Sequence, residues 1–64
     1  MIKCKAIVEN PLQRDNLCEC CIIMGIKPNV VHDTVSVSFD EKYERAETLM
    51  CLFEQYSRHE ITTA

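Results

Sequence analysis

The sequence predicts a small α+β domain that spans residues 1–64 as one unit. Over residues 2–8 and 34–39, apolar residues recur at every second position, which is the period of a half-buried strand. Over residues 17–24 and 43–56 they recur at intervals of three and four, which is the period of one helix face. Capping and turn-forming residues separate these runs, so the expected order is β-α-β-β-α.

The first strand and first helix have clear boundaries. The strand is expected to place Ile2, Cys4, Ala6 and Val8 on its inner face. Asn10 is a typical helix cap, and Pro11 suits the first helical position. The inward positions of this helix are expected at Leu17, Cys20, Cys21 and Met24. Gly25 can end the helix in a left-handed conformation, with Ile26 placed for a hydrophobic contact and Pro28 preventing continuation.

Residues 29–39 can be read as one strand or as a hairpin. A single strand would place Asp33 on the core face, where an isolated carboxylate is costly. A tight turn at His32 and Asp33 removes this conflict and leaves a short strand at Val30 and Val31. The hairpin is therefore favoured, with Val35, Val37 and Phe39 of the second strand facing inward.

Asp40 is expected to cap the second helix, which continues to about Ser57. Its inward stripe is Tyr43, Ala46, Leu49, Met50, Phe53 and Tyr56. Residues 59–63 are compatible with a final short edge strand. The resulting order, β-α-β-β-α with this final strand, is that of a ferredoxin-like sandwich, in which two helices cover one face of a small sheet.

The first half of the chain resembles an ACT domain. The resemblance rests on Ala6-Ile7-Val8-Glu9-Asn10-Pro11, Leu17, Met24-Gly25-Ile26 and Asn29-Val30-Val31. It implies a small regulatory module that pairs side by side and binds amino acids at the interface. Leu12 stands where that family has a glycine after the proline.

A second resemblance is to the heavy-metal-associated domains of copper chaperones. Val35-Ser36-Val37-Ser38-Phe39-Asp40 and the amphipathic helix after it are similar to their third strand and second helix. Those domains bind metal through Cys-x-x-Cys in the loop that opens the first helix. Here Cys18-Glu19-Cys20-Cys21 lies late in the helix, so the metal role is not carried over.

Composition excludes several classes of function. The net charge is −3, the basic residues are scattered and Trp is absent, so nucleic acid is not an expected partner. No apolar run is long enough for a membrane span, and no export signal is present. We therefore expect a cytoplasmic protein whose thiols stay reduced, in agreement with the odd number of cysteines, five.

The five thiols are expected to differ in burial. Cys4 and Cys20 are predicted to lie in the core with Cys21 at its margin, whereas Cys18 and Cys51 are predicted at the surface. A zinc site is the alternative considered. Its ligands would be Cys4, Cys20 and Cys21, with His32, Cys18 or Cys51 as the fourth. No second Cys-x-x-Cys motif supports it, so neither a metal nor a cofactor is expected.

No catalytic motif is recognisable, because the chain has no phosphate-binding glycine loop and its His32-Asp33 and His59-Glu60 neighbours point to opposite faces of extended chain. We expect a non-enzymatic regulatory module that acts through protein–protein contact, as a homodimer, with Ile7, Cys18 and Ile22 at the contact surface. Two alternatives remain open. One is a thiol-based metal-binding or redox protein, with Cys18 and Cys21 as the redox pair, and the other is an ACT-like small-molecule sensor.

Overall fold

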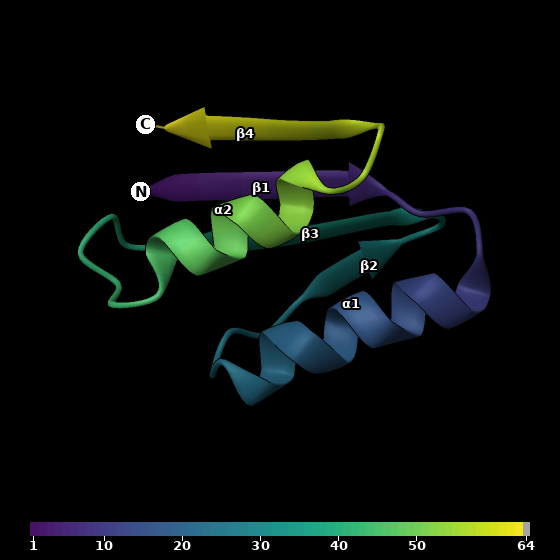
Figure 1. Ribbon diagram of the computed structural model, residues 1–64, viewed down its shortest axis with the longest axis horizontal. Helices are drawn as coiled ribbons and strands as arrows, with labels where there is room; N and C mark the ends of the chain where they lie inside the picture. The colour runs from purple at the N-terminus through teal and green to yellow at the C-terminus, as the bar shows by residue number, and fades with distance from the viewer. Residues whose placement is uncertain (64) are drawn as a thin grey trace.

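The structure, a computed structural model, describes residues 1–63 and contains four strands and two helices (Figure 1). In chain order these elements are β1 (Ile2–Ile7), α1 (Pro11–Ile23), β2 (Asn29–Val31), β3 (Thr34–Phe39), α2 (Ala46–Glu54) and β4 (His59–Thr63). The predicted order is confirmed, and the final short strand is present. Neither helix within residues 1–63 is long and apolar enough to cross a membrane.

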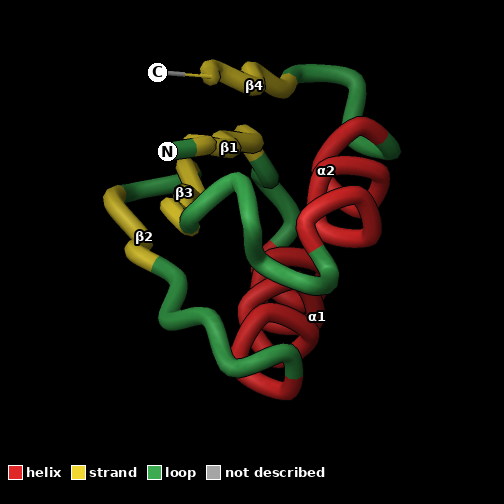
Figure 2. The backbone as a smooth tube through the Cα atoms, turned by 90° about the vertical axis from the view of Figure 1, so that its left-hand side faces the viewer, coloured by secondary structure: helices red, strands yellow, loops and turns green. Residues whose placement is uncertain are grey.

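The four strands form one antiparallel sheet in the order β2-β3-β1-β4. Strands β1 and β3 are central, and the two shorter strands β2 and β4 lie at the edges. Both helices lie on the same face of this sheet, so the protein has two layers (Figure 2). The first and last strands are neighbours, with Ile2 opposite Thr63.

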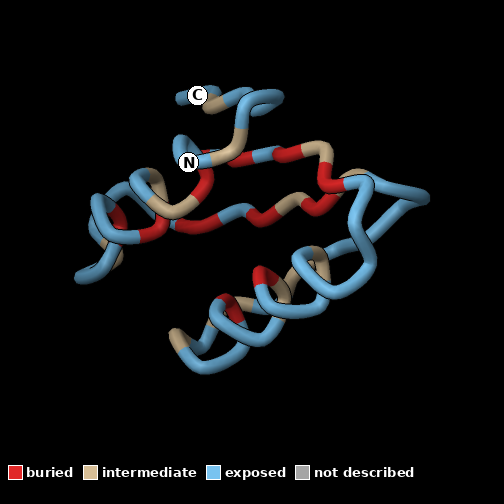
Figure 3. The backbone as a smooth tube through the Cα atoms, turned by 45° about the vertical axis from the view of Figure 1, so that its right-hand side comes forward, coloured by how far each residue is buried: buried red, intermediate tan, exposed pale blue. Residues whose placement is uncertain are grey.

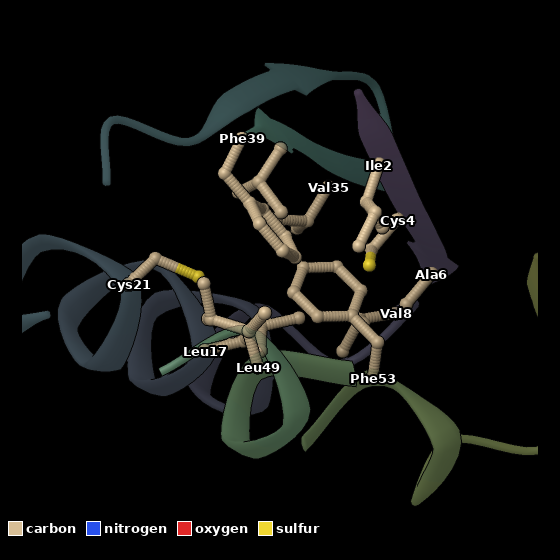
Figure 4. Packing of buried hydrophobic residues seen from close by; sticks show 12 residues of the cluster. Ile2, Cys4, Ala6, Val8, Leu17, Cys21, Val35, Phe39, Leu49 and Phe53 are labelled. Atoms are coloured by element: carbon tan, nitrogen blue, oxygen red, sulfur yellow. The ribbon is translucent and has the colours of Figure 1, made fainter. Parts of the chain in front are cut away.

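The core lies between the sheet and the helices (Figure 4). Its buried members are Ile2, Cys4, Ala6, Val8, Leu17, Cys21, Val35, Val37, Phe39, Ala46, Leu49 and Phe53. Phe53 of α2 lies near the middle of the cluster, beside residues of β1. No polar or charged residue is buried among residues 1–63, so the stability of the fold depends on apolar burial in a thin core.

Both ends of α1 are closed by hydrogen bonds, as predicted. The Asn10 side-chain oxygen accepts hydrogen bonds from the backbone N–H groups of Leu12 and Gln13, at 2.9 and 3.2 Å. At the other end Gly25 has a φ of +84°, and the N–H groups of Gly25 and Ile26 donate to carbonyls of the last turns at 2.9 Å. This pattern of bonds stops the helix at a defined residue.

The β2–β3 hairpin turns at His32, as predicted, and this residue has a φ of +55°. The turn keeps Asp33 out of the core. The Arg14 guanidinium binds the Asp33 carboxylate at 2.8 Å and the Val8 carbonyl at 3.2 Å, and the Val8 N–H donates to the Asp33 carbonyl at 2.8 Å. The hairpin is therefore tied to α1 and to the end of β1.

The start of α2 differs from the prediction, because the helix begins at Ala46 and Asp40 does not cap it. The Asp40 carboxylate accepts a hydrogen bond from the backbone two residues on, at 2.9 Å, and so closes a turn. Within the following turns, the Tyr43 ring packs on Phe39 with 5.6 Å between centroids, and its hydroxyl donates to the Met24 carbonyl. Tyr43 thus holds residues 40–45 against the end of α1, and regular helix starts only after them.

The end of α2 is also earlier than predicted. The helix stops at Glu54, before Ser57, and Gln55 is its C-terminal cap. The chain then turns back, and the Ile7 N–H donates to the Arg58 carbonyl at 2.9 Å. This reversal allows β4 to pair with β1.

Candidate interaction surface and thiol groove

The sequence placed three of the five thiols wrongly, and one of them is Cys21, which was predicted at the margin of the core but is fully buried. Cys4 and Cys21 are buried and Cys51 is exposed, but Cys20 is exposed and Cys18 is half-buried against the core. The reason is the rotation of α1 about its axis. The bonds from Arg14 to the hairpin fix the first turns of the helix. The inward stripe then contains Leu17, Cys18 and Cys21 and not Cys20.

Burial makes the core thiols poor nucleophiles. It raises the pKa of Cys21 to about 11, with a smaller contribution from Cys18 and the other nearby thiols. Burial and then Asp15 raise the pKa of Cys18, and the opposing effect of Arg14 is weaker. The pKa of Cys4 is raised by burial and by Glu54. A redox pair of Cys18 and Cys21 is therefore disfavoured, because both thiols stay protonated at neutral pH.

The zinc ligands considered from the sequence are not brought together. Within residues 1–63, no group of three or more His, Cys, Asp or Glu side chains is placed to hold a metal ion. Cys4 and Cys21 are in the core, Cys20 is on the opposite flank of α1 from Cys18, and His32 is in the hairpin turn.

Of the three residues expected at a contact surface, only Ile22 is well exposed, with 63% of its surface accessible. Ile7 is half-buried on the outer face of the sheet, where it lies opposite Thr34 of the neighbouring strand β3. Cys18 is half-buried because the rotation of α1 turns it towards the core. Figure 3 shows α1 exposed along its outer side.

The apolar surface that the sequence did not single out lies on β2. This edge strand bonds only to β3, and its residues Val30 and Val31 are 44% and 57% exposed. Val30 lies opposite the buried Val35 and so faces the helix layer, whereas Val31 lies opposite Thr34 and faces outward. We call Asn29–Val31 the β2 edge. It is uncharged and is apolar on both faces.

A groove of about 440 Å³ separates the two helices on their solvent side. Its lining consists of Cys20, Met24, Glu47, Thr48, Cys51, Leu52 and Gln55. We call it the thiol groove, because two exposed free thiols and one thioether border it. Only part of this groove is visible in the sequence, since Cys20 and Met24 are one helical turn apart but Cys51 comes from a different helix.

A shallow hollow of about 400 Å³ lies at the β4 edge of the molecule, lined by Lys5, Ala6, Ile7, Thr34, Arg58, His59 and Glu60. Its histidine is already engaged, since the His59 Nδ1 lies 2.6 Å from the Tyr56 carbonyl oxygen. Lys5 and Glu60 lie opposite each other on β1 and β4. The hollow thus has charges of both signs.

Comparison with known proteins gives no assignment, since no family model, no curated protein and no solved structure significantly matches the chain.

Proposed function

We propose that the chain is a non-enzymatic interaction module that acts through protein–protein contact as a homodimer, and that its architecture is ferredoxin-like. The antiparallel order β2-β3-β1-β4 with both helices on one face supports the architecture. The observation that carries the proposed function is the β2 edge, which has unpaired backbone groups on one side and exposed valines on both faces. Such an edge readily pairs with another strand.

A second copy of the chain is the occupant that fits the β2 edge. Two copies related by a two-fold axis at Val30 would pair antiparallel, with Asn29 of each copy opposite Val31 of the other. No charged residue lies on β2 to oppose this pairing.

The two sheet edges differ in a way that supports this choice. Strand β4 carries His59 and Glu60, and charged residues on an edge discourage pairing. Strand β2 carries no charge. On α1, Ile22 lies on the flank away from the thiol groove and adds exposed apolar surface. A domain of this size gains stability from a partner subunit, because its own core is thin.

The test is the mass of the reduced protein in solution, measured by light scattering after gel filtration at high micromolar concentration. We expect the mass of two chains for the native protein and of one chain for Val31→Glu. The matched control is Thr62→Glu on the exposed part of β4, which is expected to remain dimeric. Circular dichroism reports whether each variant is folded.

A charge change tests the register separately. Val30→Glu is expected to weaken self-association, and more so at low ionic strength, because the two-fold axis at Val30 sets the two new carboxylates opposite each other. A monomeric native protein, or equal loss of the dimer in Val31→Glu and Thr62→Glu, would contradict the proposal.

A further inference from the structure

Sulfur-bearing side chains from separate parts of the chain line the thiol groove. Cys20 and Met24 border it from one helix, and Cys51 borders it from the other. Both cysteines are free and exposed, so their sulfur atoms are accessible to an incoming ion. The Tyr43 hydroxyl donates a hydrogen bond to the Met24 carbonyl at the α1 side of the groove.

The ligand chemistry of these side chains is soft. Thiolate and thioether sulfur select soft ions such as Cu(I), whereas Mg²⁺ and Ca²⁺ prefer oxygen ligands. A structural zinc site needs four cysteine, histidine or carboxylate ligands, and the groove supplies three, the two thiols and the Glu47 carboxylate. Cu(I) is satisfied by two or three sulfur ligands, so it is the ion that this set fits best.

We propose that the thiol groove is a Cu(I) site in which Cys20 and Cys51 supply two thiolates and Met24 supplies a thioether. As the ion enters, each thiol releases its proton to water and forms a Cu–S bond. The copper stays in the +1 state, and no electron is transferred. The bound ion links α1 to α2 across the groove.

A disulfide needs the two Cα atoms within about 7 Å of each other, whereas an ion between the sulfur atoms spans a wider gap. The groove has room for such an ion, with a volume of about 440 Å³. The β2 edge and the thiol groove lie on different elements, so metal binding and dimer formation are independent proposals.

The experiment titrates reduced protein with Cu(I), supplied without oxygen as its acetonitrile complex, against a chromophoric Cu(I) chelator. One ion per chain is expected for the native protein, with a rise in Tm on binding. Cys20→Ser and Cys51→Ser are each expected to lose stoichiometric binding, and Met24→Leu is expected to bind more weakly. Cys18→Ser is the matched control, because this residue lies on the other flank of α1, and it is expected to bind as the native protein does.

Two outcomes would overturn the proposal. One is unchanged binding in Cys51→Ser, which would assign the ion to α1 alone. The other is a native protein that does not compete with the chelator. Native mass spectrometry of the same samples reports metal content and oligomer mass separately, so failure of the metal site and failure of the dimer are distinguishable. Circular dichroism of the metal-free variants shows whether a loss of binding reflects a loss of fold.

Discussion

The two helices are held in place by different means. Helix α1 has thirteen residues and hydrogen-bonded caps at both ends, yet it buries only Leu17 and Cys21 completely. Helix α2 has nine residues and no side-chain bond at its N-terminus, yet it buries Ala46, Leu49 and Phe53. Isolated helices of such lengths are marginal in water. The difference shows that a short helix can be fixed through its ends or through its inner face.

The largest expected effect concerns the inner face of α2. Phe53→Ala removes a ring from the middle of the core and is expected to lower the free energy of unfolding by about 3–5 kcal/mol. Chemical denaturation measured by circular dichroism gives this value. Glu54→Ala, at an exposed neighbouring position, is the control and should change stability by less than about 0.5 kcal/mol. Equal losses in both variants would mean that α2 is not held by its core face.

The next effect concerns the core contact of α1 and depends on pH. Because the pKa of Cys21 is raised from 9.0 to about 11, the folded state holds this proton more tightly than the unfolded state does. The resulting stability is complete below pH 9 and is lost as the pH rises towards 11, by about 2–3 kcal/mol.

Urea denaturation between pH 8 and 11 measures this loss of stability. Cys21→Ala should make the decline of stability with rising pH shallower. A smaller decline remains, because the pKa values of Cys4, Cys18 and Tyr56 are raised in the same direction. An unchanged slope in Cys21→Ala would contradict the assignment.

A smaller effect is expected at the C-terminal end of α1. Gly25→Ala should cost about 1–2 kcal/mol, because its φ of +84° is unfavourable for a residue with a side chain. An added Cβ would meet no atom within 4 Å, so the cost is conformational and not steric. Gly25→Asn, which tolerates this conformation better, should lose less. Thermal unfolding of the two variants gives the ranking, and an Asn variant as unstable as the Ala variant would contradict it.

The smallest effect is expected at the N-terminal ends of the two helices. Asn10→Ala should lower stability by about 1 kcal/mol, because two backbone N–H groups lose their acceptor. Asn10→Ser keeps an acceptor and should retain most of the stability. Arg45→Ala, at the corresponding position of α2, should have almost no effect, since the Arg45 side chain makes no capping bond. If the two alanine variants lose the same stability in urea denaturation, the contrast between the helices fails.

This contrast explains which parts of the fold could be predicted. The ends of α1 were predicted correctly, because Asn10, Pro11 and Gly25 act on their own backbone and need no partner. Its rotation was not, since it depends on tertiary contacts such as the packing of Leu17 and Cys21 and the bond from Arg14 to the hairpin. The exposure of Cys18 and Cys20 followed from this rotation and was therefore assigned wrongly.

For α2, the burial of the side chains was predicted correctly, whereas the ends of the helix were not. Its apolar stripe is strong enough that the burial of Leu49 and Phe53 and the exposure of Cys51 were all predicted correctly. Its start was wrong, because the Tyr43 hydroxyl contacts the Met24 carbonyl at the end of α1, which is distant in the sequence. The thiol groove was missed for the same reason, since it exists only where two separate helices meet.

The pairing of β1 with β4 has a consequence for the speed of folding. Ile2 lies opposite Thr63, so this contact closes a loop that spans almost the whole described chain. Closing long loops costs entropy before any contact compensates for it, and folds rich in distant contacts are slow to form. We expect the hairpin of β2 and β3 to form early and β4 to dock last. Until then, the backbone groups of β1 that pair with β4 remain exposed and can bind another strand.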